Sequence, residues 1–244
     1  MAGLNDLISS ADDAPQASGL GGSMGGSIGG SSNKELMADA RIALSGNWGM
    51  GVLGYVLYIV LMLSFYLFVF SAALFVGVAG GLGGGNTVAA GEAMKGAVQI
   101  VELLLTGAFT VGFCSFFLVI AQEGEARLEC LFTGFKRFWK SFGAYFLSTL
   151  FIVLWTMLFI VPGIIATFRY AMVYFIIADD EDCGPLEAIT RSKEMMEGNK
   201  WKFFCLHWRF FWWAILCNLT LGIGYLWLVP YMQTSFAKFY EDVK

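Results

Sequence analysis

The sequence predicts an all-α protein, a polytopic transmembrane helical bundle with about six spans and both termini in the cytoplasm. Its composition is 57% hydrophobic and only 14% charged, whereas ordinary soluble domains are about a quarter charged. Residues 142–178 contain a single formal charge, Arg169. That block is too long for one bilayer crossing of about 20 apolar residues and suits two. Lysine and arginine are also distributed unevenly among the predicted loops.

The chain is expected to divide into a disordered Gly/Ser-rich tail, 1–33, and an integral membrane helical domain, 34–244. The tail contains the run SGLGGSMGGSIGGSS at 18–32, which has too few apolar side chains to fold. Residues 34–46 follow with apolar side chains at helical spacing, and Trp48 comes two positions after them. This pattern predicts a short amphipathic helix on the membrane surface.

The apolar blocks of the domain predict six spans. They are 50–76, 97–121, 142–161, 164–178, 203–217 and 221–237. The third and fourth are separated by a helix break at Pro162 and Gly163, and the fifth and sixth by one at Gly222 and Gly224. The fourth and fifth rise only about 22 Å, against a hydrocarbon core of about 30 Å. Re-entrant hairpins therefore remain an alternative for both broken blocks.

An amphipathic helix is predicted between the fourth and fifth spans, at 185–199. Pro185 is suited to a first helical position. Leu186, Ile189, Lys193 and Met196 share one face at helical spacing, and the stem of Lys193 is expected to lie along that face.

The positive-inside rule orients the predicted spans. With the amino terminus inside, twelve of the fifteen Lys and Arg residues fall in cytoplasmic segments. They are Lys34, Arg41, Arg127, Lys136, Arg137, Lys140, Arg191, Lys193, Lys200, Lys202, Lys238 and Lys244. Lys95 falls outside, and Arg169 and Arg209 lie within spans. The orientation is the same for re-entrant hairpins, because each broken block then also begins and ends on one face.

Two groups of charged residues are candidate sites. Glu102 and Arg169 both lie about five residues, ~7.5 Å, below the outer boundary of their spans. Because an ionised side chain at that depth is costly alone, they are a candidate intramembrane ion pair. The alternative is that each extends separately to the interface. Arg209 is within reach of Asp179 and Asp180 in this topology, which predicts an inner-face charge cluster.

Enzyme, metal and nucleic-acid signatures are not found in the sequence. The five cysteines have no C-x-x-C spacing, and a single histidine does not complete a zinc site. Two G-x-S-x-G matches fall in the Gly/Ser tract, away from any strand-to-helix turn. A net charge of −4 without a basic stripe gives no support to nucleic-acid binding. We therefore expect no cofactor, no catalytic or metal-binding residue, and no enzymatic activity.

The second half of the chain resembles an uncharacterised bacterial integral membrane family, domain of unknown function 975. The runs that carry the resemblance are FTGF at 132–135, LW at 154–155, IVPGII at 160–165, RY at 169–170, EAI at 187–189, SKEMM at 192–196, GNKWK at 198–202, GIG at 222–224, PY at 230–231 and FY at 239–240. The resemblance covers about 34–244 and is densest after Phe132. Asn199 stands where the family pattern has a histidine. The resemblance implies a multi-span bacterial membrane protein and no established activity.

Two functions are expected from these observations. The first is a non-enzymatic protein of the bacterial inner membrane that organises the membrane or binds a partner. Its partners would be the lipid bilayer and another membrane protein or a second copy of the chain. The alternative is a small transporter or channel, because broken helices such as those near Pro162 and Gly222 expose backbone at transporter binding sites.

Overall fold

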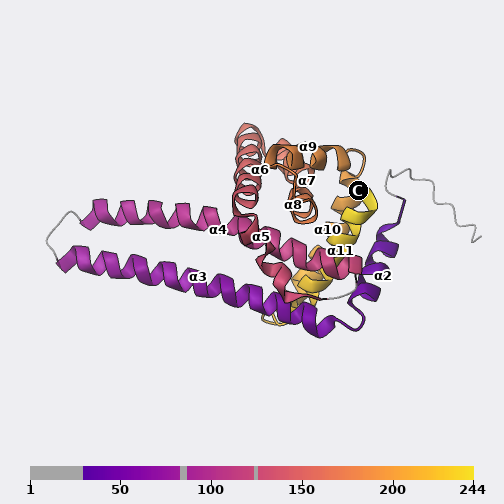
Figure 1. The fold of residues 1–244 in the computed structure, drawn as a ribbon, viewed down its shortest axis with the longest axis horizontal. Helices are drawn as coiled ribbons and strands as arrows, with labels where there is room; N and C mark the ends of the chain where they lie inside the picture. Colours follow the sequence, from indigo (N-terminus) through magenta and orange to yellow (C-terminus); the bar gives the residue numbers. More distant parts are fainter. Residues whose placement is uncertain (1–29, 83–86, 124–125) are drawn as a thin grey trace, which may run out of the picture.

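The computed structural model describes residues 30–82, 87–123 and 126–244, and this part of the chain contains helices and no strand (Figure 1). The predicted all-α class is confirmed. The helices are α2 (Asn33–Leu44), α3 (Trp48–Leu82), α4 (Thr87–Glu123), the 3-10 helix η1 (Leu128–Phe132), α5 (Thr133–Lys136), α6 (Phe138–Leu158), α7 (Ile160–Arg169), α8 (Val173–Asp179), α9 (Pro185–Met195), α10 (Lys200–Leu219) and α11 (Tyr225–Val243).

Four described segments are long and apolar enough to cross a membrane. They are Trp48–Ala72, Val98–Gln122, Phe138–Leu158 and Ile160–Asp179, and they correspond to the first four predicted spans. The predicted fifth and sixth spans are helices too, α10 and α11. They are less apolar, because α10 contains Lys200, Lys202 and Arg209 and α11 ends in a charged turn.

The α3 and α4 helices leave the rest of the protein together as a long antiparallel pair (Figure 1). The other helices gather around the second half of α4, and α6 runs across the direction of α3 and α4 in this view. The described helices are therefore not all parallel. Few residues in the membrane-length part of α3, Trp48–Ala72, are buried, whereas most of the membrane-length part of α4 is buried.

Small residues let neighbouring segments approach α4 closely. A Cβ added at Gly112 would lie 1.9 Å from the carbonyl oxygen of Leu131 in η1. One added at Gly134 in α5 would lie 1.8 Å from the carbonyl oxygen of Ala108. Because no side chain fits at either position, glycine fixes the contact of α4 with the η1–α5 segment.

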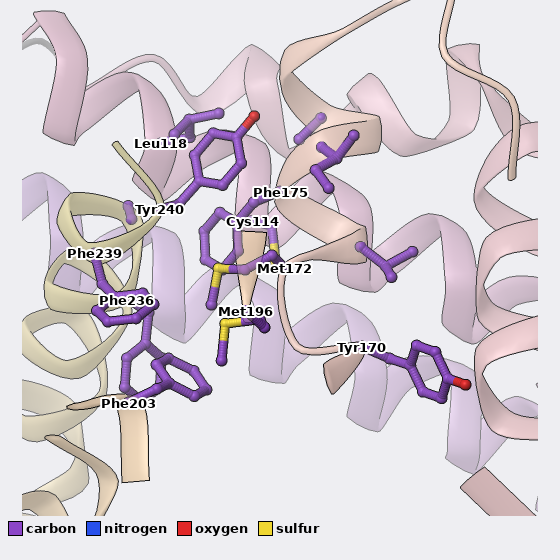
Figure 2. Close-up of a cluster of buried hydrophobic side chains, with 14 of the residues drawn as sticks. Cys114, Leu118, Tyr170, Met172, Phe175, Met196, Phe203, Phe236, Phe239 and Tyr240 are labelled. Atoms are coloured by element: carbon purple, nitrogen blue, oxygen red, sulfur yellow. The ribbon is translucent and has the colours of Figure 1, made fainter. Parts of the chain in front are cut away.

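The aromatic and sulfur-containing core lies around α8 (Figure 2). Met172 is fully buried, and the ring of Phe175 stacks on Tyr240 with centroids 5.8 Å apart. Phe203 from α10 packs against Phe236 and Phe239 from α11. The second half of the predicted fourth span is thus covered by protein.

The predicted fourth span is interrupted, a feature for which the sequence contains no signal. The helix ends at Arg169 and resumes at Val173, so that Tyr170, Ala171 and Met172 form a break. The hydroxyl of Ser192 in α9 donates to the carbonyl oxygen of Arg169 at 2.9 Å. A backbone carbonyl freed at the break is therefore satisfied by a neighbouring helix.

The turn between α6 and α7 does not lie at Pro162 and Gly163, where the sequence predicted a helix break. It lies at Phe159, whose backbone is extended (φ −157°, ψ 145°), and Pro162 belongs to the first turn of α7. Proline is tolerated there because the first turn has no intrahelical partner for its missing N–H. Gly163 instead permits close packing on α6, since a Cβ would lie 2.3 Å from the Thr156 hydroxyl.

The turn between α10 and α11 falls at the glycines where a break is predicted. Gly222 has a φ of +85°, which favours glycine. Gly224 packs against Cys217, whose sulfur would lie 2.5 Å from an added Cβ. The neighbouring Leu221 also has a left-handed backbone conformation, with φ 54°, although it is not a glycine.

The two amphipathic helices pack mainly on protein. Leu36, Ala40 and Leu44 of α2 are buried, because α2 packs on α11 and α4. The apolar face of α2 therefore contacts protein, whereas the sequence predicted that it lies on the membrane surface. The Ser32 and Glu35 side chains form a reciprocal capping box at its start.

In α9 the predicted apolar face is only partly buried. Ile189 and Met196 are buried, but Leu186 is 63% exposed. The Lys193 ammonium lies 5.8 Å and 5.7 Å from the ring centroids of Phe151 and Tyr170. The Lys193 side chain thus extends from the predicted apolar face, and its ammonium makes cation–π contacts with these two rings.

Candidate functional site

The described residues form four ion pairs, which we call together the polar base. It consists of Arg137–Glu181, Asp180–Arg191, Asp179–Lys244 and Lys202–Asp242. Further hydrogen bonds extend two of these pairs: Gln122 donates to Asp179 and Glu241, and the backbone N–H of Ser31 donates to Asp242. The beginning of the described chain and its carboxyl end therefore meet in the polar base.

The predicted inner-face cluster has other partners in the structure. Asp179 accepts hydrogen bonds from Lys244 at 2.5 Å and from the Tyr240 hydroxyl at 2.9 Å. Asp180 pairs with Arg191 at 3.3 Å. Arg209 is exposed on α10, about 10 Å along the helix from Lys202. The signal for the correct partners was present in the sequence, because the charged carboxyl end was assigned to the same face as Asp179.

Glu102 and Arg169 are likewise not paired with each other among the described ion pairs. Glu102 accepts a hydrogen bond from the Tyr66 hydroxyl at 2.7 Å, which links α4 to α3. Arg169 is exposed at the end of α7, where it lines a small hollow of about 100 Å³ with Trp155 and Pro162. Among the described residues, the hydrogen-bond partner of Glu102 is therefore Tyr66 and not the predicted Arg169.

A cavity of about 540 Å³ lies between α3, α4, α7, α8, α10 and α11, and we call it the central cavity. Its polar lining side chains are Tyr55, Tyr58, Thr110, Thr167, Tyr174, His207 and Gln233. No lysine, arginine, aspartate or glutamate is among the described residues that line it. Aromatic rings, including those of Phe113, Phe203 and Phe236, supply much of the remaining wall. This composition suits an uncharged guest that hydrogen-bonds.

The helix break between α7 and α8 opens onto the central cavity. Ala171, in the middle of the break, is part of the lining. Pro162 and Gly222, the predicted breaks, lie at hairpin turns and are not part of it. The feature expected of a transporter site therefore occurs at a position that sequence reasoning missed, because no proline or glycine marks it.

The single histidine is held by aromatic packing at the wall of the central cavity. His207 stacks on Phe236 with centroids 4.4 Å apart, and its Nδ1 lies 3.3 Å from the carbonyl oxygen of Phe203. Within the described residues no group of three His, Cys, Asp or Glu side chains is placed to hold a metal ion. The arrangement of the cavity suits binding by shape and hydrogen bonds.

The described chain is helical and contains four apolar segments of membrane length. These are the features of an integral membrane protein. The family described as Protein of unknown function (DUF975) matches residues 24–168 and 158–244, so the chain belongs to this family. The resemblance found in the sequence is confirmed. No curated protein and no solved structure matches the chain.

Proposed function

We propose that this chain is a multi-pass, non-enzymatic protein of the bacterial inner membrane that organises the membrane or binds a membrane-embedded partner. The observation that carries the proposal is the separation of charged and apolar surface. The residues of the four described ion pairs lie in α9, at helix ends or in connecting segments away from the turns at Phe159 and Leu221, whereas those hairpin turns present large apolar side chains. In water such a surface would be an aggregation liability, and in a bilayer it is the expected exterior.

The apolar hairpin tips are continuous along the sequence. On α6 and α7 the exposed residues are Trp155, Met157, Leu158, Phe159, Ile160 and Val161, and on the α10–α11 turn they are Leu219, Leu221 and Ile223. Each contributes favourable transfer free energy only if the tip leaves water, at about 25 cal/mol per Å². We therefore assign the tips to the interior of the bilayer or to its far interface.

In this proposed orientation the polar base and both termini lie in the cytoplasm. Ser31 and Asp242 are joined by a hydrogen bond of 3.0 Å, which supports a common side for the two ends. The excess of Lys and Arg in the base-forming segments supports the cytoplasmic side. About six crossings would require the α3–α4, α6–α7 and α10–α11 hairpins to run along one axis. Because α6 runs across α3 and α4 in Figure 1, re-entrant hairpins remain the alternative for the two broken blocks.

Cysteine labelling tests this orientation. In a cysteine-free background, we expect Glu181→Cys at the base to react with a membrane-impermeant thiol reagent only after the inner membrane is opened. We expect Phe159→Cys and Leu221→Cys at the tips not to react from the cytoplasmic side. Labelling of the tips from outside indicates complete crossings, and complete protection indicates tips that end inside the bilayer. Reaction of the tips from the cytoplasm would contradict the proposal.

Exposed α3 is the surface on which a membrane partner is expected. Leu63 and Leu67 are 55% and 58% exposed, and α4 is the main helix that covers α3. A photo-crosslinking residue at Leu63 should trap lipid, another membrane protein or a second copy of the chain in cells. The same residue at buried Leu118 is the matched control and should crosslink only within the chain.

A small transporter or channel is the second candidate function. The central cavity and the break at Ala171 support it, since unwound backbone beside a cavity is a device of transporter binding sites. If the cavity is hydrated and reachable, Ala171→Cys should react with a small water-soluble thiol reagent much faster than Met172→Cys, whose native side chain is fully buried. Equal rates at the two positions would count against transport through this cavity.

A further inference from the structure

A second cavity, of about 500 Å³, lies between α10, α11 and the corner that joins α2 to α3, and we call it the lateral groove. It is lined by Arg41, Trp48, Trp213, Leu216, Cys217, Thr220, Gly224, Trp227, Leu228 and Tyr231. None of these residues lines the central cavity. Its volume falls within the range of about 300–1,000 Å³ typical of ligand sites.

Arg41 is the one charged residue among the described residues that line the lateral groove. Its Nε donates to the hydroxyl of Tyr231 at 3.1 Å, and its guanidinium carbon lies 5.3 Å from the Tyr231 ring centroid. The Tyr231 hydroxyl donates in turn to the carbonyl oxygen of Met37 at 3.2 Å. These contacts hold the guanidinium in place, and no carboxylate pairs with it in the described part of the chain.

The rest of the lateral groove is an elongated apolar wall. Along α11 it extends from Tyr231 to Gly224, and along α10 from Trp213 to Thr220. Each stretch rises about 10 Å, or two helical turns. Trp48 and Trp227 also line it, and the ring of a tryptophan offers a large apolar contact area. The groove thus has a fixed cation at one end and a lipid-compatible wall leading away from it.

We propose that the lateral groove binds an anionic phospholipid, with the phosphate on Arg41 and an acyl chain along the tryptophan-lined wall. A guanidinium suits phosphate because its planar donors bind two oxygens at once. An apolar helix of a partner would leave the cation without a counter-charge. The inference rests on the membrane residence proposed above, which the labelling experiment tests separately. With the polar base in the cytoplasm, the occupant is a lipid of the inner leaflet.

Native mass spectrometry of the full-length protein tests the headgroup. In detergent micelles with equal amounts of phosphatidylglycerol and phosphatidylethanolamine, the wild type should retain phosphatidylglycerol preferentially. Arg41→Gln should reduce that preference about tenfold, the order expected for loss of one charge-assisted contact. Lys34→Gln is the matched control, because Lys34 is an exposed cation on the same helix outside the groove.

A second pair of variants tests the acyl-chain wall. Trp213→Ala should lower retention of the lipid several-fold, whereas Trp212→Ala should not. The two side chains are 52% and 56% exposed, but only Trp213 lines the groove. Equal retention of the two lipids by the wild type, or equal losses in the Arg41 and Lys34 variants, would overturn the proposal. So would displacement of the lipid by millimolar inorganic phosphate, or a lipid-free dimer.

Discussion

Asp242→Asn should destabilise the protein by about 3 kcal/mol, because it removes the carboxylate that the buried ammonium of Lys202 contacts. The two charged atoms are 2.5 Å apart, and the side chains are only 9% and 10% exposed. The ammonium also lies 5.5 Å from the ring centroid of Phe239, so it cannot turn to solvent without disturbing the core. The measurement is the thermal unfolding midpoint of the purified protein in detergent.

A double variant and a more exposed pair serve as controls. Lys202→Met with Asp242→Asn should recover most of the loss, because a neutral pair leaves no buried charge and the introduced amide oxygen still accepts from the Ser31 N–H. Arg191→Gln should cost less than about 1 kcal/mol, since Arg191 and Asp180 are each about 40% exposed. If Asp242→Asn costs no more than Arg191→Gln, the buried pair does not stabilise the base as proposed.

The same carboxylate predicts a pH dependence. Burial by itself would raise the pKa of Asp242, but the hydrogen bonds from Lys202 and Ser31 outweigh it and lower the pKa below its ordinary value. A lowered pKa in the folded state stabilises the fold above the unfolded pKa of about 3.9. That contribution is lost as pH falls through the folded pKa. The wild-type midpoint should therefore fall more steeply than that of Asp242→Asn between about pH 5 and pH 2.

Gly112→Ala should destabilise the protein by about 3 kcal/mol or more, the upper range for overpacking a close contact. The added methyl group would meet the Leu131 carbonyl oxygen at 1.9 Å, and a backbone atom cannot move aside as a flexible side chain can. Gly134→Ala should behave alike, because its methyl group would meet the Ala108 carbonyl oxygen. Both should reduce the yield of monodisperse protein and lower the unfolding midpoint.

The matched control is Gly96→Ala on the same helix. Nothing lies within 4 Å of a Cβ added there, and alanine is favoured over glycine in a helix by about 1 kcal/mol. We therefore expect a neutral or slightly stabilising change. A Gly112→Ala protein that melts with the wild type would show that α4 and η1 are not in the close contact described.

Part of the architecture was predictable because it depends on properties local in the sequence. The length of an apolar run decides whether a helix is able to cross a bilayer, and four predicted spans coincide with membrane-length helices. Gly222 marked a turn for a local reason as well, since its positive φ favours glycine. The turn predicted at Pro162 lies three residues earlier in the structure, at Phe159, because proline also occurs in the first turn of a helix.

The candidate site was less predictable, because it depends on which helices meet. Charge predicted that Asp179 lies at the base, but its partners are Lys244 and Tyr240, more than 60 residues away. Depth predicted that Glu102 needs a polar neighbour, but that neighbour is Tyr66 on the adjacent helix. No glycine or proline marks the helix break at Ala171 in the sequence. It is held instead by Ser192 of α9.

The sequence by itself determined the helical class, the apolar segments and the family. These follow from composition, periodicity and order along the chain, which need no knowledge of neighbours. Only the tertiary structure decided the ion-pair partners in the polar base, the interruption of the fourth predicted span, and the two cavities. The physical reason is that a cavity or a buried pair exists only between helices, and packing between helices is set by contacts distant in the sequence.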